Sequence, residues 1–253
     1  MSEEVILKTT NLSKSFSSGG AIQHILKNLN IEIYKGEFLV IMGSSGAGKS
    51  TLLYSVSGMD KPSLGEVVCC GEDITKYNMD KLADFRSRHC GFVFQQINLV
   101  GSMSLMDNVL TLGLLGKKSR REIVQRAEAL FEKVDIPAIT RAKFPNQVSG
   151  GEAQRSAIVR ALINDPDILF ADEPTGALNA ANTQAVLDIF TEFNREGQTV
   201  VMVTHDIKSA RRGDRIIYLD DGKIAGECRL GRYMSGDKDR HDRLGAFLAE
   251  MGW

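Results

Sequence analysis

One segment restricts the possible folds of this chain more than any other. The nine residues GSSGAGKST, at positions 43–51, follow an apolar run at 38–42. They match the pattern GxxxxGK[ST] in the order that this pattern requires, a strand, then a loop, then a helix. Glycines let such a loop turn its backbone N–H groups inward, and the N-terminus of the following helix adds positive potential for a phosphate chain. The segment predicts a nucleotide-phosphate site in an α/β protein.

The residues of this segment have separate expected roles. Lys49 neutralises the β and γ phosphates, and the Ser50 hydroxyl can ligate Mg²⁺. The other residues of the segment line the nucleotide site through their backbone or flank it: Gly43, Ser44, Ser45, Gly46, Ala47, Gly48 and Thr51. The alternative is a Gly/Ser turn before an ordinary helix. That alternative leaves unexplained a lysine and a serine in register with three glycines and a preceding strand.

Length and composition narrow the class of protein. A chain of 253 residues can form one α/β unit with subdomains. The 31 basic and 32 acidic residues give a net charge of −1, so we expect no nucleic-acid partner. The four cysteines include no CxxC, which predicts neither a set of zinc ligands nor a disulfide ladder, and we expect them reduced and mostly buried. No run approaches the roughly 18 apolar residues that span a membrane, so we expect a cytoplasmic chain; if it works at a membrane, another subunit supplies the spans.

Apolar runs at 38–42, 168–171 and 200–203 are short and do not alternate, which indicates buried parallel strands. Stretches with helical spacing lie between these runs, and this alternation of strands and helices predicts an α/β fold with a mostly parallel sheet. Together with the phosphate loop, it predicts the fold class of a P-loop NTPase core. Helical patterns without a strand dominate between Asn98 and Asn164, which predicts an inserted helical subdomain. We therefore expect a nucleotide-binding domain at 1–230, with a core at 1–97 and 165–230 and the helical subdomain at 98–164, and a C-terminal tail at 231–253.

Two further regions have local patterns of their own. Residues 5–11 and 25–33 alternate, and residues 216–219 and Ile224 flank an Asp-Gly turn, so both regions are predicted to be antiparallel and partly exposed. The tail carries a short amphipathic helix with the apolar stripe Leu244, Phe247, Leu248 and Met251, which we expect to pack on its own domain. A partner-docking role for this stripe is the alternative.

Polar side chains follow three of the strand-like runs. Gln95 follows residues 90–94, Asp172 and Glu173 follow 168–171, and His205 follows 200–203. Ligands of open parallel sheets bind outside the carboxyl ends of the strands, so these groups are expected to converge on the phosphate site.

Their chemistry suggests four roles. Asp172 suits an Mg²⁺ contact, and Glu173 can orient a water in line with the γ-phosphorus. Gln95 can contact both the Mg²⁺ and that water, and His205 can bond the γ-phosphate and hold Glu173. The alternatives are an ordinary core or loop histidine and a strand-terminating turn at Asp172 and Glu173.

A second phosphate site is suggested by VSGGEAQR at 148–155. Ser149 and Glu152 form a capping-box pattern, which alone could explain the segment. The adjacent Gly150 and Gly151 add nothing to a cap and carry a backbone-entropy cost, but they allow a phosphate or another backbone to approach closely. Because the chain already has one phosphate loop, we expect this helix N-terminus to serve the nucleotide of a partner. The basic run KKSRR at 117–121 could form a nucleic-acid or acidic-lipid patch, but Ser119 within it forms another capping-box pattern with Glu122, which favours an exposed helix start.

GSSGAGKST, FVFQQ, VSGGEAQR, ILFADEPTGAL and VTHD, in this order, resemble the nucleotide-binding subunit of an ABC transporter over about residues 4–227. The resemblance implies two copies packed head to tail, with each ATP between Lys49 of one copy and Ser149, Gly150 and Gly151 of the other. It implies a separate integral membrane permease, a chain peripheral on the inner face of the cell membrane, and stacking of adenine on Phe16. A core phenylalanine is the alternative for Phe16.

Within that family the motifs resemble the group that serves macrolide efflux, lipoprotein release and bacitracin-type peptide resistance. We expect ATP hydrolysis that powers export of, or resistance to, antimicrobial peptides or other amphipathic compounds. The alternative is a lipoprotein-releasing complex or a cell-division complex that regulates an extracellular hydrolase. Two residues depart from the family pattern, Asn179 in place of aspartate and Glu152 in place of glutamine.

Overall fold

The main sheet of the computed structural model, which describes residues 4–18, 21–116 and 118–253, has six strands in the order β11-β10-β4-β9-β8-β7. Only β11 runs antiparallel to its neighbour, and the other pairs in these described residues are parallel. The strand bounds are β4 Phe38–Gly43, β7 Cys90–Phe94, β8 Ile168–Asp172, β9 Thr199–Val203, β10 Arg215–Asp220 and β11 Lys223–Arg229. The α/β class predicted from the motifs is confirmed.

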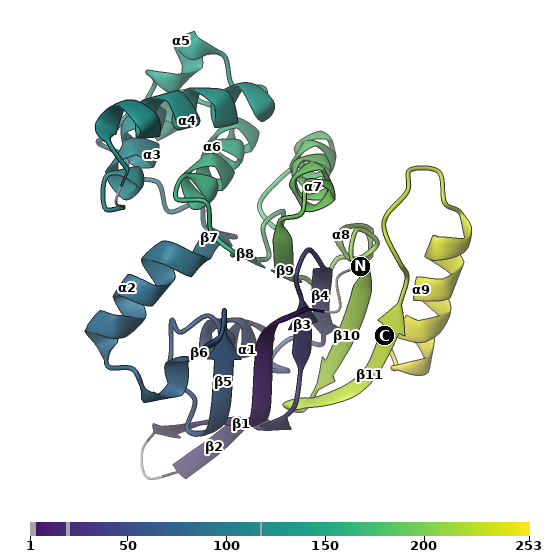
Figure 1. Cartoon of the computed structure of the whole chain (residues 1–253). Helices are drawn as coiled ribbons and strands as arrows, with labels where there is room; N and C mark the ends of the chain where they lie inside the picture. Colours follow the sequence, from purple (N-terminus) through teal and green to yellow (C-terminus); the bar gives the residue numbers. More distant parts are fainter. Residues whose placement is uncertain (1–3, 19–20, 117) are drawn as a thin grey trace.

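The three apolar runs lie in the middle of this sheet, where both faces are covered. Every residue of β8 and of β9 is buried, as expected for central parallel strands. Alternate side chains of β4 enter two separate hydrophobic clusters, with Val40 in the cluster of α3–α7 and Ile41 in the cluster of α1 and α2. The sheet is therefore the layer on which both groups of helices pack (Figure 1).

A second sheet lies beside the first and contains β1 Val5–Ser18, β2 Ala21–Leu29, β3 Glu32–Tyr34, β5 Leu64–Cys69 and β6 Glu72–Asp73. Its described pairs are antiparallel, as predicted. The region at 25–33 is divided between two of these strands, because β2 ends and β3 begins within it. The Asn30 side-chain oxygen accepts the hydrogen bond of the Asn11 N–H there, and Asn28 has a left-handed φ of 55°.

Residues 216–219 were predicted to be antiparallel and partly exposed, and the predicted exposure is wrong. β10 pairs antiparallel with β11 as predicted, but on its other side it pairs parallel with β4, and its residues are buried except Asp220. A two-residue turn reveals only the hairpin partner. Because β10 has a partner on each side, it lies inside the sheet and its side chains are buried on both faces.

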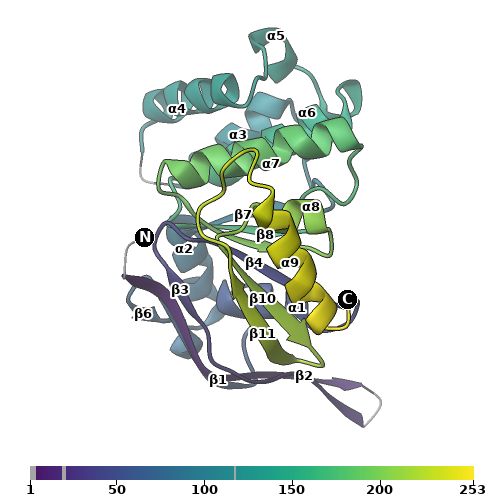
Figure 2. The ribbon, with the colours of Figure 1, turned by 90° about the vertical axis from the view of Figure 1, so that its right-hand side faces the viewer.

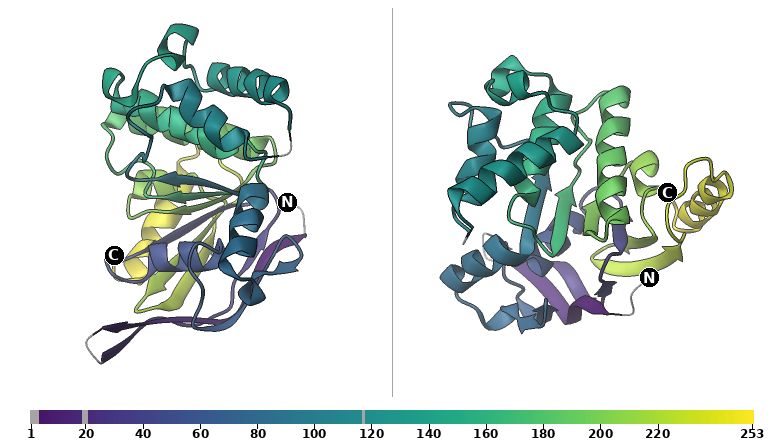
Figure 3. Two further views of the ribbon diagram at one scale, coloured as in Figure 1. Left: turned by 90° about the vertical axis from the view of Figure 1, so that its left-hand side faces the viewer. Right: turned by 45° about the horizontal axis from the view of Figure 1, so that its top comes forward.

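Helices account for the structure between Leu105 and Leu162, in α3 Leu105–Gly113, α4 Arg120–Lys133, α5 Ala138–Arg141, the 3-10 turn η2 Pro145–Gln147 and α6 Gly150–Leu162. They form a group of their own beside one end of the sheet strands (Figures 1 and 3). The domain boundaries drawn from the sequence stay a prediction. Lys117 of the basic run lies outside the described residues.

The remaining helices cover the two sheets. They are α1 Lys49–Val56, η1 Ile74–Lys76, α2 Met79–His89, α7 Ala180–Arg195, α8 Ile207–Ala210 and α9 Asp239–Glu250. α9 lies alongside β10 and β11 (Figure 2), with Leu244 and Leu248 buried in the same cluster as the sheet. The C-terminal stripe therefore packs on its own chain. No helix in the described part of the chain has the length and apolar character needed to cross a bilayer.

Candidate functional site

The phosphate loop connects β4 to α1 through a backbone that only glycine accommodates. A Cβ on Gly43 would lie 2.1 Å from the Leu219 carbonyl oxygen, and Gly48 has a φ of +99° with its Cβ position 2.9 Å from Leu26. Gly48 is also the N-cap of α1 and supplies no side chain to the first-turn N–H groups. The positive end of α1 is therefore open to an anion.

Lys49 folds back over this loop. Its Nζ donates hydrogen bonds to the carbonyl oxygens of Gly43 and Ser44, each at 2.9 Å. Burial lowers the pKa of Lys49, and the nearby carboxylates of Glu173 and Asp172 oppose that effect. The ammonium group thus lies in the loop with its charge favoured by two acidic groups across the site.

Asp172, the last residue of β8, is joined to two residues of α1. Ser50 Oγ donates to its Oδ1 at 2.9 Å, and the Tyr54 hydroxyl donates to its Oδ2 at 2.7 Å. Burial and this hydrogen bond raise the pKa of Tyr54 to about 12, so the hydroxyl keeps its proton as a donor. Sequence reasoning missed Tyr54. Its place four residues after Ser50, on the same helix face, was the available signal.

The ends of β8 and β9 bring together the expected acid and histidine. The Glu173 N–H donates to the Val203 carbonyl oxygen, and its Oε1 lies 2.8 Å from Nδ1 of His205. Glu173 has a left-handed φ of 48°, a conformation that non-glycine residues adopt at a cost and that often occurs at functional sites. The His205 side chain is 62% exposed, so the core alternative for this residue is wrong.

Gln95 and Gln154 connect the loop after β7 with the loop after β8. The Gln95 side chain lies beside Gly176, where a Cβ would come within 2.8 Å of its Nε2. The buried Gln154 donates from Nε2 to the carbonyl oxygens of Phe94 and Pro174, at 3.1 and 2.7 Å. Sequence reasoning also missed Gln154, although it lies inside the segment 148–155 that was singled out.

The N-terminus of α6 has the predicted capping box. The Ser149 Oγ accepts from the Glu152 N–H at 3.2 Å, and Glu152 accepts from the Ser149 N–H at 2.8 Å. That backbone bond, followed by the bond from the Ser149 hydroxyl, lowers the pKa of Glu152. A Cβ on Gly151 would lie 2.3 Å from the Asn182 side chain, whereas one on the exposed Gly150 would meet only Leu178, at 3.7 Å. The structure supplies an internal reason for the second glycine and none for the first.

Two further predicted positions have clear surroundings. Phe16 on β1 is 46% exposed, with Lys14 Nζ 4.9 Å from its ring centroid, so the core alternative is wrong and the ring can be reached by a ligand. Asn179 is the N-cap of α7 and accepts from the Asn182 N–H at 3.0 Å. Asparagine and aspartate cap helices about equally well, so this departure leaves the cap intact.

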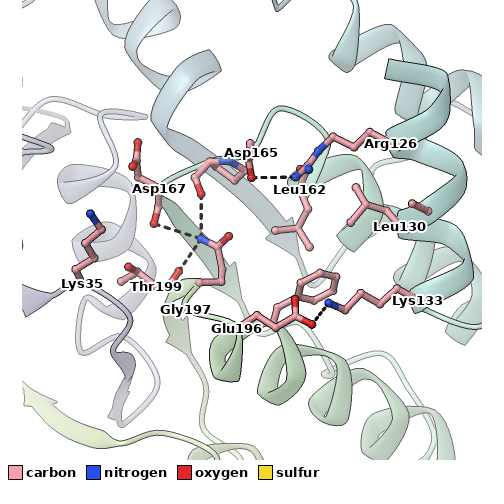
Figure 4. Close-up of a pocket in the computed structure, with 14 residues that line it drawn as sticks. Lys35, Arg126, Leu130, Lys133, Leu162, Asp165, Asp167, Glu196, Gly197 and Thr199 are labelled. Atoms are coloured by element: carbon pink, nitrogen blue, oxygen red, sulfur yellow. Dashed lines mark hydrogen bonds and ion pairs between the residues drawn. The ribbon is translucent and has the colours of Figure 1, made fainter. Parts of the chain in front are cut away.

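The opposite ends of the same strands border a different, more charged cavity of about 570 Å³ (Figure 4). Arg126 of α4 pairs with Asp165 at 3.0 Å, and Lys133 of α4 pairs with Glu196. These ion pairs join α4 to the segment before β8 and to the end of α7. The cavity is separate from the phosphate loop, because it lies where β8 and β9 begin and the loop lies where they end.

The comparisons with known proteins agree with this site. The family model described as ABC transporter matches residues 26–176. The uncharacterized ABC transporter ATP-binding protein MJ0796 of Methanocaldococcus jannaschii is 42% identical over 229 residues, covering 89% of this chain and 97% of that protein. The macrolide export ATP-binding/permease protein MacB of Shewanella sp. strain ANA-3 is 39% identical over 219 residues, covering 87% of this chain. The chain spans 33% of that MacB protein, about a third of its length.

A solved structure gives the same result for the fold. The dimeric structure of a post-hydrolysis state of the ATP-binding cassette MJ0796, bound to ADP and Pi, superposes with a TM-score of 0.82 and 39% sequence identity. The match covers 90% of this chain and all of that one. The fold and the phosphate loop define a P-loop nucleotide-binding protein. The chain belongs to the ABC transporter family, in which it is an ATP-binding cassette.

Proposed function

We propose that two copies of this chain bind and hydrolyse ATP between them and thereby move a separate membrane permease. The observation that carries this proposal is the convergence of Lys49, Ser50, Asp172, Glu173 and His205 at the ends of β4, β8 and β9. These are the groups that phosphoryl transfer to water requires, a phosphate clamp, oxygen ligands for a cation and a positioned base.

The oxygen donors fit Mg²⁺, which prefers hard oxygen ligands. Ser50 Oγ and Asp172 Oδ1 lie 2.9 Å apart, and the amide oxygen of Gln95 is the third proposed ligand. When bound, Mg²⁺ supplies positive charge to the β and γ phosphates. Residues 43–48 and Thr51 surround the phosphates through loop N–H groups and the start of α1, and Lys49 adds its charge.

Glu173 is the proposed catalytic base. It orients a water and accepts its proton as the water oxygen attacks the γ-phosphorus, and the bond from that phosphorus to the bridging oxygen breaks to release ADP and phosphate. His205 holds the Glu173 carboxylate through the 2.8 Å contact and reaches the γ-phosphate from its exposed position. Phe16 stacks on the adenine from β1.

The second half of each site comes from the other copy. Ser149, Gly150, Gly151 and Glu152 offer a capped but side-chain-poor helix N-terminus, which suits the γ-phosphate of a nucleotide held by the partner's loop. The related MJ0796 cassette forms a dimer bound to ADP and Pi, which supports the same assembly for this chain.

The hydrolysis step is tested with Glu173→Gln. The variant should bind ATP, lose at least about 100-fold in turnover, and accumulate as an ATP-dependent dimer, because the water loses its base while every phosphate contact remains. Size-exclusion chromatography with light scattering and a phosphate-release assay measure both effects. Lys49→Ala is the matched variant that should lose nucleotide binding itself. Turnover at the wild-type rate in Glu173→Gln contradicts the proposal.

A groove between α2, β7, α3 and α6 fits a helix of the permease. This cavity of about 460 Å³ is lined mainly by apolar side chains, and Val100 and Leu115 at its rim are 49% and 72% exposed. Amphipathic helices bind in grooves of this kind through their apolar face. Through such a partner the chain would lie on the inner face of the cell membrane.

The groove is tested with Leu115→Glu. Because Leu115 is exposed, the variant should fold and hydrolyse ATP but lose co-purification with the permease that the wild-type chain recovers from its own cells. Ile139→Glu on α5, where the side chain is 77% exposed outside the groove, is the matched control and should co-purify normally. Equal recovery of the permease with both variants contradicts this docking site.

The proposed cargo is an amphipathic toxic compound, antimicrobial peptides included. Support comes from relatives named for macrolide export, such as MacB of Shewanella. Cells that lack this chain should become sensitive to cationic peptides or macrolides and should regain resistance with the wild-type chain but not with Glu173→Gln. Unchanged sensitivity to both classes of compound contradicts this cargo.

A further inference from the structure

One group of three side chains in the described residues brings metal-ligating atoms together, and the ATPase site does not use it. The group contains Cys70, His89 and Asp167, whose ligand atoms all lie within 4.8 Å of one another. Cys70 is in the turn between β5 and β6, His89 is the last residue of α2, and Asp167 directly precedes β8. Three segments that are distant in the sequence therefore meet at this cluster.

The sheet register explains why two of them meet. β7 and β8 are parallel neighbours whose first pair is Cys90 with Ile168. The residues just before that pair are therefore adjacent, and Nδ1 of His89 lies 2.6 Å from Oδ2 of Asp167. The phosphate site lies at the other end of β8, five residues away, which at the usual rise of a strand is about 16 Å. The two sites are separate.

The turn does not explain the thiol. Cys69 pairs with Glu72, so Cys70 and Gly71 form a two-residue turn, with φ angles of 51° and 79°. Such turns favour Asn-Gly or Asp-Gly because both central residues have a positive φ. A cysteine in the first position is strained and contributes nothing to the turn.

Cys70 is also the most available of the three neighbouring thiols. Cys69 is fully buried, and the Cys90 thiol points to the Ser57 carbonyl oxygen, at 3.8 Å. Cys70 is half-buried, and Asp167 is exposed on the cavity of Figure 4, so solvent reaches the cluster.

We propose that Cys70, His89 and Asp167 form a binding site for Zn²⁺. A thiolate, an imidazole and a carboxylate are the three ligand types that zinc uses, and a three-ligand set leaves the fourth position to water. Zinc bond lengths place ligand atoms about 3.4 to 3.6 Å apart in a tetrahedral site, so a separation of 4.8 Å must shorten by about 1.2 to 1.4 Å, and the 2.6 Å contact between His89 and Asp167 must lengthen by about 0.8 Å. The ion replaces the proton that His89 shares with Asp167.

The charges around the cluster are compatible with a cation. Arg88 Nη1 lies 2.8 Å from Nε2 of His89 and opposes a metal ion, but Glu72 Oε1 lies 3.6 Å from the same nitrogen. Arg88 is itself paired with Asp84 and Glu72. The carboxylates of Asp167 and Glu72 thus lie at the site, and the Cys70 thiolate that forms when the ion binds adds a third negative charge. A bound ion would tie the β5–β6 turn to α2 and to the start of β8.

The test is a Co²⁺ titration of the reduced whole chain without nucleotide or Mg²⁺, followed by displacement with Zn²⁺. The wild type should show a thiolate-to-cobalt charge-transfer band and the visible bands of tetrahedral cobalt, and Zn²⁺ should abolish both and raise the Tm. Cys70→Ser should lose the charge-transfer band, while Cys228→Ser on β11 is the matched control and should keep it.

Asp167→Asn tests the site independently of the thiol, because its exposed side chain can change without disturbing the fold. It should weaken Co²⁺ binding at least tenfold while the metal-free Tm stays close to that of the wild type. Circular dichroism confirms that each variant is folded. The proposal is overturned if the wild type shows no charge-transfer band, if the band persists in Cys70→Ser, or if Asp167→Asn binds Co²⁺ as tightly as the wild type.

Discussion

Helices α4 and α6 begin with the same cap and continue in opposite ways. In both, a serine side chain accepts from the N–H of a glutamate three residues on, and that glutamate accepts from the serine N–H, through the pairs Ser119 with Glu122 and Ser149 with Glu152. After the cap, α4 continues with the exposed Arg120 and Arg121, and α6 with Gly150 and Gly151.

This difference shows what marks a phosphate site. Both caps satisfy the same backbone donors, so a capping box alone says nothing about a ligand. In α4 the cap is followed by two long, exposed side chains, whereas in α6 it is followed by two residues without side chains, which leaves the positive end of the helix open to an anion. The glycines distinguish the two helices, and Gly150 does so most clearly because nothing within its own chain requires it.

The largest effect is expected from adding a negative charge at the two caps. Ser149→Asp keeps a good N-cap but places a carboxylate where the account puts a γ-phosphate, and such juxtaposed charges are unfavourable by several kcal/mol. ATPase activity should fall about 100-fold or more. Ser119→Asp is the matched control, because it places the same carboxylate beside Glu122 and so introduces the same repulsion within a cap. The Ser119→Asp variant should retain its ATPase activity. Equal losses in the two variants would show that the cap of α6 has no special role.

Gly151→Ala should have the next largest effect, on folding. Its Cβ would lie 2.3 Å from the Asn182 side chain, so that side chain must move or α6 and α7 must shift apart. We expect a loss of about 1–3 kcal/mol in the free energy of unfolding, the usual range for overpacking. Urea denaturation measures it. A variant as stable as the wild type would mean that Asn182 moves away freely.

Gly150→Ala should separate stability from activity. Its Cβ meets only Leu178, at an ordinary 3.7 Å, so the substitution should stabilise the helix by up to about 1 kcal/mol. ATPase activity should nevertheless fall, because the added methyl group lies between the partner's phosphate and the first turn. Denaturation and phosphate release measured on one preparation check both signs. An active, more stable variant would remove the reason given for this glycine.

The smallest effect concerns the glutamates of the two caps, and it should be alike in both. Hydrogen bonds from the cap serine lower the pKa of Glu152 and of Glu122. A lowered folded-state pKa adds stability that is fully present above the ordinary glutamate pKa and is lost as the pH falls through the folded-state value. Glu152→Gln and Glu122→Gln should therefore each reduce the acid dependence of unfolding by a similar amount. Unfolding curves recorded at several acidic pH values check this, and a dependence unchanged in either variant would contradict it.

The sequence was informative where one segment contains both the motif and its context. The phosphate loop, the buried strands and the strand-end residues Asp172, Glu173 and His205 follow from local pattern plus the rule that ligands bind at the carboxyl ends of parallel strands. The division of residues 25–33 between β2 and β3 could not be predicted in this way, because it depends on a hydrogen bond from the Asn11 N–H to the Asn30 side chain.

Contacts between distant segments were also beyond the sequence. Gln154 acts through hydrogen bonds to the carbonyl oxygens of Phe94 and Pro174, which no spacing rule reveals, whereas the helical spacing of Tyr54 from Ser50 gave a signal but not its bond to Asp172. The cysteines lack a zinc-ligand spacing, yet the folded chain places one of them beside a histidine and an aspartate from other elements. Spacing rules detect ligand sets that lie on one segment, not sets that three segments assemble.

The most direct test of the two-chain site mixes two inactive variants, Lys49→Ala and Ser149→Asp. A mixed dimer contains one site in which the intact Lys49 of one chain faces the intact Ser149 of the other. The account predicts no ATPase activity from either variant alone and recovery to about a quarter of the wild-type rate in an equal mixture, because half of the dimers are mixed and each has one intact site. A mixture that remains inactive, although its chains dimerise, would contradict a site shared between two chains.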